Sequence, residues 1–410
     1  MKILVLNCGS SSVKYQLIEM DDERLICKGI VERIGEQDAI VRYRPVGRPE
    51  KRVVRPIADH TEAIDAFLAD LLDPVIGVIQ DRREIAAVGH RVVHGGESFA
   101  QSVRVDDQVI QAIDECSVFA PLHNPANLLG IRVCMNLLPD TPNVAVFDTA
   151  FHQTMPASSY LYALPIRFYR KYKVRRYGFH GTSHRYVSQK AAEVLGRPIE
   201  ELKIITCHLG NGASIAAVKG GKSVDTSMGF TPLEGLVMGT RCGDIDPALV
   251  LYLMKQEDLT AQQMDELLNK QSGVFGLTDG VQDMRDIEDR ANKEGKPDMY
   301  DPHFDLVLDI YCHRIKKYIG AYAAVMGGVD AIVFTGGVGE NSPVVRERVC
   351  AGLEYMGVKM DDECHRINQI FSRGRRADTP NISCGSTAVL VLETNEELVI
   401  ARDTRQVLFG

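Results

Sequence analysis

The feature that most limits how this 410-residue chain can fold is a short pattern that occurs twice. In each copy an apolar strand leads into a polar turn that contains glycine, and the turn leads into a second strand. The two turns are Asn7-Cys8-Gly9-Ser10-Ser11-Ser12-Val13-Lys14 and His208-Leu209-Gly210-Asn211-Gly212-Ala213-Ser214. Backbone N–H groups, hydroxyls and a lysine suit a phosphate group, although Gly and Ser also favour ordinary turns. The repeat predicts two related domains that each present a hairpin to phosphate.

Strand and helix patterns alternate along most of the chain, which predicts an α/β fold. The expected strands are 3–6, 13–20, 24–31, 85–88, 143–147, 203–207, 214–218, 331–334 and 388–392. The expected helices are 61–72, with a Thr cap, 106–117, 124–138, 183–195, 305–325 and 396–404. We expect a first domain of residues 1–150, to which the last segment, about 386–410, returns, and a second domain of residues 151–385.

Composition argues against several functional classes. A net charge of −8 disfavours a general nucleic-acid binder, and the basic stretch 42–55 is typical of a solvated strand pair. No apolar run approaches the roughly 18 residues that a membrane span requires. A strand begins within the first residues, so we expect no signal peptide. The ten scattered cysteines favour a reduced, cytoplasmic protein over a disulfide framework.

Several familiar motifs are incomplete. Gly221-Lys222-Ser223 resembles the end of a P-loop but reads as a hairpin turn, and Gly337-Val338-Gly339 begins a dinucleotide pattern that lacks its third glycine. The pairs His90/His94 and His180/His184 have a spacing that can bind zinc on a helix, but neither has the adjacent Glu of that signature. Nucleotide chemistry in this chain therefore requires a different architecture.

Two arginines lie in similar glycine-flanked strings. Arg91 is followed by Val92-Val93-His94-Gly95-Gly96, and Arg241 stands in Met238-Gly239-Thr240-Arg241-Cys242-Gly243-Asp244. A guanidinium suits carboxylate or phosphate, whereas the plain alternative for each is a surface arginine after a strand. Asp148 ends its own strand, at the carboxyl edge where α/β proteins bind ligands. These residues predict an anion site.

With these strings in view the chain resembles the acetate kinase family. The resemblance is carried, through the whole chain, by residues 7–14, 89–96, 147–153, 176–184, 208–214, 225–244, 335–342 and 394–397. It implies two duplicated actin/hexokinase-like (ribonuclease H-like) domains with ATP in the cleft between them. It also implies a homodimer that uses Mg²⁺, with Mn²⁺ as a second candidate. The charge and composition, and not the resemblance, predict a cytoplasmic protein that binds neither nucleic acid nor membrane.

The resemblance assigns site residues by position. The implied catalytic residues are Arg91, Asp148, His180 and Arg241. The implied acyl pocket is Val93, Leu122, Phe179 and Pro232, with Arg91 as a further substrate contact. The implied metal residues are Asn7 and Glu396. The implied nucleotide residues are Ser10, Ser12, Lys14, His208, Leu209, Gly210, Asn211, Gly212, Asp283, Met284, Arg285, Gly337, Val338, Gly339, Glu340 and Asn341.

The implied reaction is the reversible phosphorylation of acetate by ATP to acetyl phosphate and ADP. Acetate is ionised at neutral pH, since its pKa is about 4, and we therefore expect Asp148 to orient an arginine or metal-bound water instead of acting as a general base. Positioning and charge stabilisation then carry the catalysis. Two alternatives stay open: a propionate or butyrate kinase, and an ATP-switched module of the same fold.

Overall fold

The computed structural model describes residues 1–121, 123–361, 363 and 380–410. Its contacts divide the chain into two compact units. The N-terminal unit comprises Met1–Gln153 and Asn395–Gly410, and the C-terminal unit comprises Thr154–Thr394. The break at residue 153 lies close to the boundary expected near residue 150. Leu122, one of the expected pocket residues, lies outside the described residues.

The N-terminal unit is built on an eight-stranded sheet with the order β5-β4-β3-β2-β1-β6-β8-β7. The strands are β1 (Lys2–Cys8), β2 (Ser12–Glu19), β3 (Arg24–Glu32), β4 (Ala39–Pro45), β5 (Lys51–Arg55), β6 (Ile85–Val92), β7 (Val103–Arg104) and β8 (Asn143–Phe147). Strands β1 to β5 form an antiparallel meander, while β6 and β8 run parallel to β1. The carboxyl ends of β1, β6 and β8 therefore meet at one edge, where ligands of α/β sheets bind.

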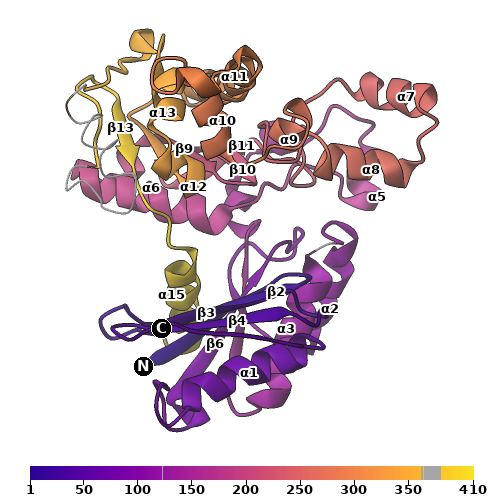
Figure 1. Cartoon of the computed structure of the whole chain (residues 1–410), viewed down its shortest axis with the longest axis vertical. Coiled ribbons are helices and arrows are strands. Elements are labelled where there is room, and N and C mark those ends of the chain that lie inside the picture. Colours follow the sequence, from indigo (N-terminus) through magenta and orange to yellow (C-terminus); the bar gives the residue numbers. More distant parts are fainter. Residues whose placement is uncertain (122, 362, 364–379) are drawn as a thin grey trace. The chain divides into compact units, whose positions relative to one another are not determined.

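Helices cover both faces of this sheet (Figure 1). They are α1 (His60–Leu72), α2 (Asp107–Glu115), α3 (Asn124–Leu137) and α15 (Glu396–Phe409), with 3₁₀ turns η1 (Arg82–Glu84), η2 (Cys116–Val118) and η3 (Ala150–Thr154). Helices α1 and α3 pack around a core that includes Phe67 and Cys134. Helix α15 packs on β1, β6 and β8, where Gly89 leaves room for Thr404 and Ile400. The C-terminal helix thus completes the unit that begins the chain.

The C-terminal unit has a five-stranded sheet with the order β11-β10-β9-β12-β13. The strands are β9 (Lys203–Leu209), β10 (Ala213–Lys219), β11 (Lys222–Thr226), β12 (Ala331–Thr335) and β13 (Ala388–Val391). As in the first unit, an antiparallel hairpin, here β9–β10, lies beside a parallel strand, here β12. The expected duplication of an α/β unit is confirmed at the level of the fold.

Helices pack on this sheet and extend beyond it (Figure 1). They are α4 (Ala157–Tyr160), α5 (Arg167–Tyr172), α6 (Gly181–Leu195), α7 (Pro247–Gln256), α8 (Ala261–Lys270), α9 (Gly273–Leu277), α10 (Met284–Ala291), α11 (Pro302–Met326), α12 (Gly336–Asn341) and α13 (Pro343–Cys350), with η4 (Ile199–Glu201), η5 (Pro297–Met299) and η6 (Glu354–Met356). Helix α6 packs on β9 and β12, and α11 packs on β9 and β10. None of the helices in the described part of the chain is both long and apolar enough to cross a membrane.

Two details differ from the sequence predictions. The first helix is capped by Asp59, whose carboxylate accepts a hydrogen bond from the Glu62 N–H at 2.9 Å, and not by a threonine; Asp is the stronger capping residue at this position. The last strand does not return to the first domain. Strand β13 pairs with β12, Ala388 opposite Ala331, so only α15 joins the N-terminal unit.

Candidate active site

In the N-terminal unit Arg91 and Asp148 form a close ion pair at the carboxyl edge of the sheet. Arg91 is on β6 and Asp148 follows β8. The Arg91 Nη2 lies 2.6 Å from Asp148 Oδ2, and Nε donates to both carboxylate oxygens at 3.1 Å. The Asp148 side chain is 1% exposed and that of Arg91 is 22% exposed. Since Nε and Nη2 both donate to Asp148, the N–H groups of Nη1 are the part of the guanidinium that faces away from this carboxylate and can donate to an anion.

Two asparagines of α3 hold the segment that follows Arg91. The Val93 N–H donates to Asn127 Oδ1 at 3.0 Å, and Asn127 Nδ2 donates to the Cys8 carbonyl at 2.7 Å. Asn124 likewise accepts from the His94 N–H at 3.1 Å and donates to the His94 carbonyl at 2.9 Å. Both asparagines are buried. Neither asparagine was predicted to have a role. Two Asn side chains three residues apart at the start of a helix could have indicated hydrogen bonds to the backbone of a neighbouring loop.

The first hairpin places its polar residues at the same edge of the N-terminal unit. Asn7 and Lys14 are opposite each other in the β1–β2 ladder, and the turn is closed by a 2.8 Å bond from the Gly9 N–H to the Ser12 carbonyl. Ser10 and Lys14 are exposed, and Ser12 is half-buried. Asn7 Oδ1 lies 3.5 Å from Arg91 Nη1. The hairpin therefore leaves hydroxyls and an ammonium open to a phosphate.

Glu396 begins α15 and lies within the electrostatic field of Arg91 and Asp148. Burial raises the pKa of Glu396 to about 7, partly opposed by the charge of Arg91 and reinforced by that of Asp148. Asn7, Asp148 and Glu396 offer oxygen atoms, the ligands Mg²⁺ prefers. Within the described residues no group of three or more His, Cys, Asp or Glu could hold a metal ion. The donor set thus fits an ion that keeps water or phosphate ligands.

The C-terminal unit brings His180 and Arg241 to one glycine of the second hairpin. A Cβ placed on Gly212 would lie 3.4 Å from Arg241 Nη1 and 3.6 Å from His180 Cε1. His180 has φ 56°, in the left-handed region, at the start of α6. A non-glycine residue held in this region stores strain of a kind that clusters at functional sites.

Arg241 has no carboxylate partner among the described residues of the C-terminal unit. Its Nη1 donates to the Pro232 carbonyl at 3.2 Å and lies 3.9 Å from the Met238 sulfur. Burial lowers the pKa of the Arg241 guanidinium from its usual value. Sequence proximity suggested acidic neighbours, but Asp244 accepts from the Tyr318 hydroxyl at 2.7 Å and faces Arg314 at 3.8 Å. Arg241 is therefore a half-buried cation whose charge is available to an anionic ligand.

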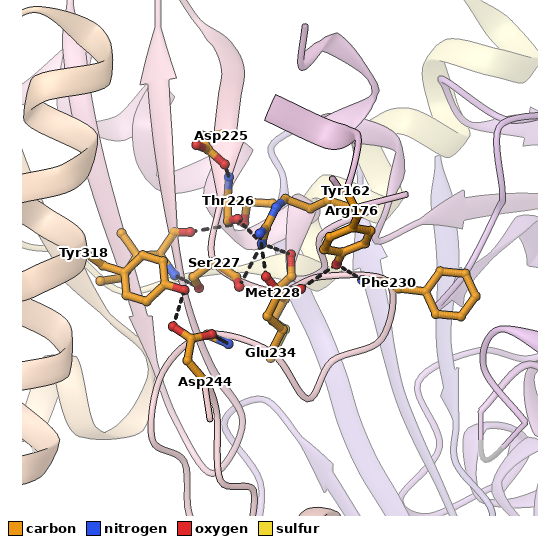
Figure 2. Close-up of polar contacts among 12 residues, drawn as sticks. Tyr162, Arg176, Asp225, Thr226, Ser227, Met228, Phe230, Glu234, Asp244 and Tyr318 are labelled. Carbon is orange, nitrogen blue, oxygen red and sulfur yellow. Dashed lines mark hydrogen bonds and ion pairs between the residues drawn. The ribbon is translucent and has the colours of Figure 1, made fainter. Parts of the chain in front are cut away.

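Arg176 bonds residues 226–228 and Glu234, which lie before and after Pro232 in the loop that continues to Arg241. Figure 2 draws these contacts of Arg176. Its Nη1 donates to the carbonyls of Thr226, Ser227 and Met228 at 2.9, 3.1 and 3.1 Å, and its Nη2 donates to Glu234 at 2.5 Å. The Tyr162 hydroxyl bonds the other oxygen of Glu234. Burial acts to lower the pKa of Arg176, but the charge of Glu234, together with Tyr322, Tyr162 and Asp225, opposes it and the pKa is raised. Sequence reasoning missed this cluster, because the residues come from three separated segments.

A pocket of about 860 Å³ opens in the C-terminal unit. Eight residues expected to bind nucleotide line it: Gly210, Asn211, Asp283, Met284, Arg285, Gly337, Val338 and Asn341. Glu288, Tyr311 and Ser342, which the sequence analysis did not select, line it too. The Tyr311 hydroxyl is buried and has no hydrogen-bond partner in the described part of the chain, and Ser342 donates to Glu288. Burial raises the pKa of Glu288.

The other expected nucleotide residues of this unit do not line that pocket. Leu209 is fully buried in β9 and could offer a ligand only its backbone. His208 bonds Ser183 Oγ through Nδ1 at 2.8 Å, and Gly212 faces Arg241 and His180. Glu340 accepts from the N–H of Gly336 at 3.0 Å, which braces the turn at Gly337 and Gly339. These residues shape the hairpin and the α12 turn that border the pocket.

The described residues of the expected acyl pocket are apolar but come from different units. Val93 is buried in the N-terminal unit, one residue beyond the end of β6. Its N–H bonds Asn127 and not a neighbouring strand, so Val93 is fixed by α3 and not by the sheet. In the C-terminal unit Phe179 is buried next to His180, and Pro232 is half-buried beside Arg241.

Arginines placed at glycine-rich hairpins and a large pocket are typical of an α/β phosphotransferase. Here one arginine is held by a carboxylate, and the other has no carboxylate partner among the described residues of its unit. The chain belongs to the Acetokinase family, whose model matches residues 2–402. It is 59% identical to an acetate kinase of Thermotoga maritima, over 100% of this chain and 99% of that one. A crystal structure of Porphyromonas gingivalis acetate kinase superposes with a TM-score of 0.91 at 48% identity, covering 99% of each chain. A propionate kinase of Francisella tularensis superposes with a TM-score of 0.89 at 38% identity, covering 99% of this chain and 100% of that one.

Proposed function

We propose that the protein transfers the γ-phosphoryl group of ATP to acetate, giving acetyl phosphate and ADP in a reversible in-line displacement. A carboxylate oxygen forms the new bond to phosphorus as the bond to the leaving ADP oxygen breaks. The observation that carries the proposal is Arg241, a half-buried guanidinium that shares the face of Gly212 with His180. Among the described residues of its own unit it has no carboxylate partner. Such a cation lowers the repulsion between an anionic acceptor and a polyanionic donor.

In this proposal Arg91 binds the acetate carboxylate and Asp148 keeps Arg91 in place. The two contacts from Nε and the 2.6 Å contact from Nη2 fix the plane of the guanidinium, which directs Nη1 toward the ligand. Asp148 is thereby engaged by Arg91, which supports an orienting role over that of a general base. The pocket beside Asp283 and Val338 receives the nucleoside, and the two hairpins receive the phosphates.

The proposed metal residues are Asn7 and Glu396, with Mg²⁺ and then Mn²⁺ as candidates. A bound divalent ion supplies positive charge that neutralises the phosphates. The raised pKa of Glu396, to about 7, supports this assignment, because a nearby cation would favour the ionised carboxylate. Lys14 adds a further positive charge at the same edge of the sheet.

The proposal is tested by trapping the acyl phosphate with hydroxylamine. ATP, Mg²⁺ and a series of carboxylates from formate to butyrate are supplied, and hydroxamate and ADP are measured in parallel. We expect equal amounts of both products, with acetate the best substrate. ADP formation without hydroxamate would instead indicate an ATP-switched module and would overturn the proposal.

A propionate kinase is the second candidate, and the likeness to the Francisella protein supports it. It performs the same chemistry in a roomier acyl pocket. The carboxylate series distinguishes the two, because kcat/KM for propionate would then exceed that for acetate.

We also propose a homodimer in the cytoplasm. Helix α7 supports self-association, since none of its residues is buried and Leu251 and Tyr252 are 71% and 58% exposed. Exposed apolar side chains in a row are typical of an interface. Light scattering should give twice the chain mass, and Leu251→Asp should shift it toward the monomer. Val75→Asp, at an 81% exposed site of the other unit, is the matched control.

A further inference from the structure

We infer that Thr206 and Ser214 act through His184 to fix the tautomer of His180, so that its neutral ring presents an Nε2–H. Four side chains form an unbroken chain inside the C-terminal unit. Thr206 Oγ1 lies 2.7 Å from His184 Nδ1, and His184 Nε2 lies 2.7 Å from Ser214 Oγ. Ser214 Oγ in turn lies 2.9 Å from His180 Nδ1. The first three residues are fully buried. The inference rests on the donor role proposed for His180.

Ser214 couples the two imidazoles. A hydroxyl has one proton to donate, yet Ser214 Oγ contacts a ring nitrogen of both His184 and His180. No other group in the described part of the chain forms a hydrogen bond with this buried hydroxyl, so if it accepted from both rings its own proton would have no acceptor. It therefore donates to one ring and accepts from the other. If it accepts from His184 Nε2–H, it donates to His180 Nδ1, and a neutral His180 then has its proton on Nε2. The opposite direction would place that proton on Nδ1.

Thr206 selects the direction. Its hydroxyl has two candidate acceptors, His184 Nδ1 at 2.7 Å and the Ala216 carbonyl at 3.5 Å. Hydroxyl hydrogen bonds are normally 2.5–3.0 Å long, so the proton belongs on the His184 side. A ring nitrogen that accepts a hydrogen bond carries no proton, which leaves Nε2 as the protonated nitrogen of His184. Donation then runs from Thr206 through His184 and Ser214 to His180.

The resulting Nε2–H of His180 lies where the proposed chemistry needs a donor. A Cβ on Gly212 would lie 3.7 Å from His180 Nε2 and 3.4 Å from Arg241 Nη1, so both groups line one face of the second hairpin. The His180 ring also stacks on His208 with 4.3 Å between ring centroids. Thr206, His184 and Ser214 are thus positioning residues that keep a donor aimed without requiring that His180 be charged.

The test reads the tautomer directly, by NMR of ¹⁵N-histidine-labelled protein without nucleotide or acetate. His180 signals are assigned by their loss in His180→Gln. We expect the wild type to have a protonated Nε2 and an unprotonated Nδ1 at this residue. Thr206→Val, which removes the hydroxyl at nearly constant volume, should give His180 a mixed or reversed pattern. Thr206→Ser, which keeps the hydroxyl, should preserve the wild-type pattern. A proton on Nδ1 of wild-type His180, or an unchanged pattern in Thr206→Val, overturns the inference.

Kinetics provide a second readout. Thr206→Val and Ser214→Ala should lower kcat roughly 10-fold, with smaller changes in KM for ATP and acetate, because the misdirected donor acts on the transition state. Thr206→Ser should restore kcat. Equal kcat in Thr206→Val and Thr206→Ser would overturn the positioning role. A failure of the proposed function would differ, since the wild type would then form no acyl phosphate while its tautomer pattern stayed the same.

Discussion

The two units stabilise a half-buried arginine in opposite ways. In the N-terminal unit, burial acts to lower the pKa of Arg91, but the charges of Asp148, Glu396 and Glu397 and the hydrogen bond to Asp148 oppose it, and the pKa is raised. In the C-terminal unit, burial alone acts on Arg241, and its pKa is lowered. Arg91 is held by a carboxylate, whereas Arg241 is held by the Pro232 carbonyl.

The difference assigns distinct tasks to two sequence strings that look alike. Arg91 with its partner Asp148 carries little net charge and offers mainly geometry. Arg241 keeps a full positive charge in a partly desolvated place, where an anion gains most from it. The ion pair between Arg176 and Glu234 holds the loop that contains Arg241. The carboxylate of this pair lies on Arg176, so Arg241 itself is bonded only to the Pro232 carbonyl among these groups.

Replacing either arginine should reduce activity more than any other change considered below. Arg241→Ala and Arg91→Ala should each lower kcat by about 10³-fold or more, as for other arginines that stabilise phosphoryl transfer. Lysine should not restore activity at either position, because an ammonium cannot make a bidentate contact. The measurement is acyl phosphate formation at saturating ATP and acetate. Turnover near that of the wild type in Arg241→Ala would remove Arg241 from the mechanism.

Stability should separate the same two variants. Arg91→Ala leaves Asp148 buried without its partner, which typically costs about 3 kcal/mol or more of unfolding free energy. Arg241→Ala leaves no buried carboxylate without its partner and should leave the free energy of unfolding nearly unchanged. Urea unfolding of both variants and of Arg91→Ala/Asp148→Ala checks this, since the double variant should regain part of the loss. Equal destabilisation by the two single variants would contradict the view that only Arg91 is needed to compensate a buried carboxylate.

A smaller loss is expected from loosening the Arg241 loop. Arg176→Lys keeps the charge but cannot reach three carbonyls and Glu234 together, so kcat/KM for acetate should fall roughly 10-fold to 100-fold. Arg170→Lys, at an exposed site in α5, is the control and should behave as the wild type. An unchanged kcat/KM in Arg176→Lys would show that the loop of Arg241 is held by other contacts.

Glu396 should make the stability of the N-terminal unit depend on pH and, as the proposed metal ligand, on Mg²⁺. The pKa of Glu396 is raised from 4.5 to about 7, so between these two pH values the folded state holds a proton that the unfolded state has released. The stabilisation it gives is complete below pH 4.5 and is lost as pH rises through about 7. We expect the metal-free protein to lose stability across this window and Glu396→Gln to flatten the loss. Thermal unfolding at several pH values, with and without Mg²⁺, is the measurement.

The neighbouring carboxylate supplies the control for the metal. Glu396→Ala should raise the Mg²⁺ concentration needed for half-maximal activity several-fold, while Glu397→Ala should change it much less, since only Glu396 is proposed as a ligand. Equal metal dependence in the two variants would count against Glu396.

Strand patterns and glycine turns were enough to predict the two α/β units and both hairpins, because buried strands and tight turns have local signatures. The expected metal and nucleotide residues came from the family resemblance and stay predictions, even where Asn211 and Val338 line one pocket. Asn124 and Asn127 bond backbone groups 30 and 34 residues away in the chain, and Arg176 and Glu234 are 58 residues apart. Such contacts appear only once the chain is folded, and the strand pairing of Ala388 was mistaken for the same reason.

The last prediction concerns a substitution in the proposed acyl pocket, for which we expect the smallest change. It tests whether the N-terminal unit also determines the preference for acetate over propionate. Val93 is buried just beyond β6 and is anchored through its N–H to Asn127, so its side chain is fixed relative to Arg91. Val93→Ala should improve kcat/KM for propionate relative to acetate by about 10-fold, within the roughly 1–3 kcal/mol that one methylene is worth in an apolar pocket. The ratio is measured with both acids at saturating ATP. Val105→Ala, at another buried valine of the same unit, is the matched control and should leave the ratio unchanged. A wild type that favours propionate, or a Val93→Ala ratio equal to that of the wild type, would remove Val93 from the acyl pocket and leave specificity to the Phe179 and Pro232 side of the C-terminal unit.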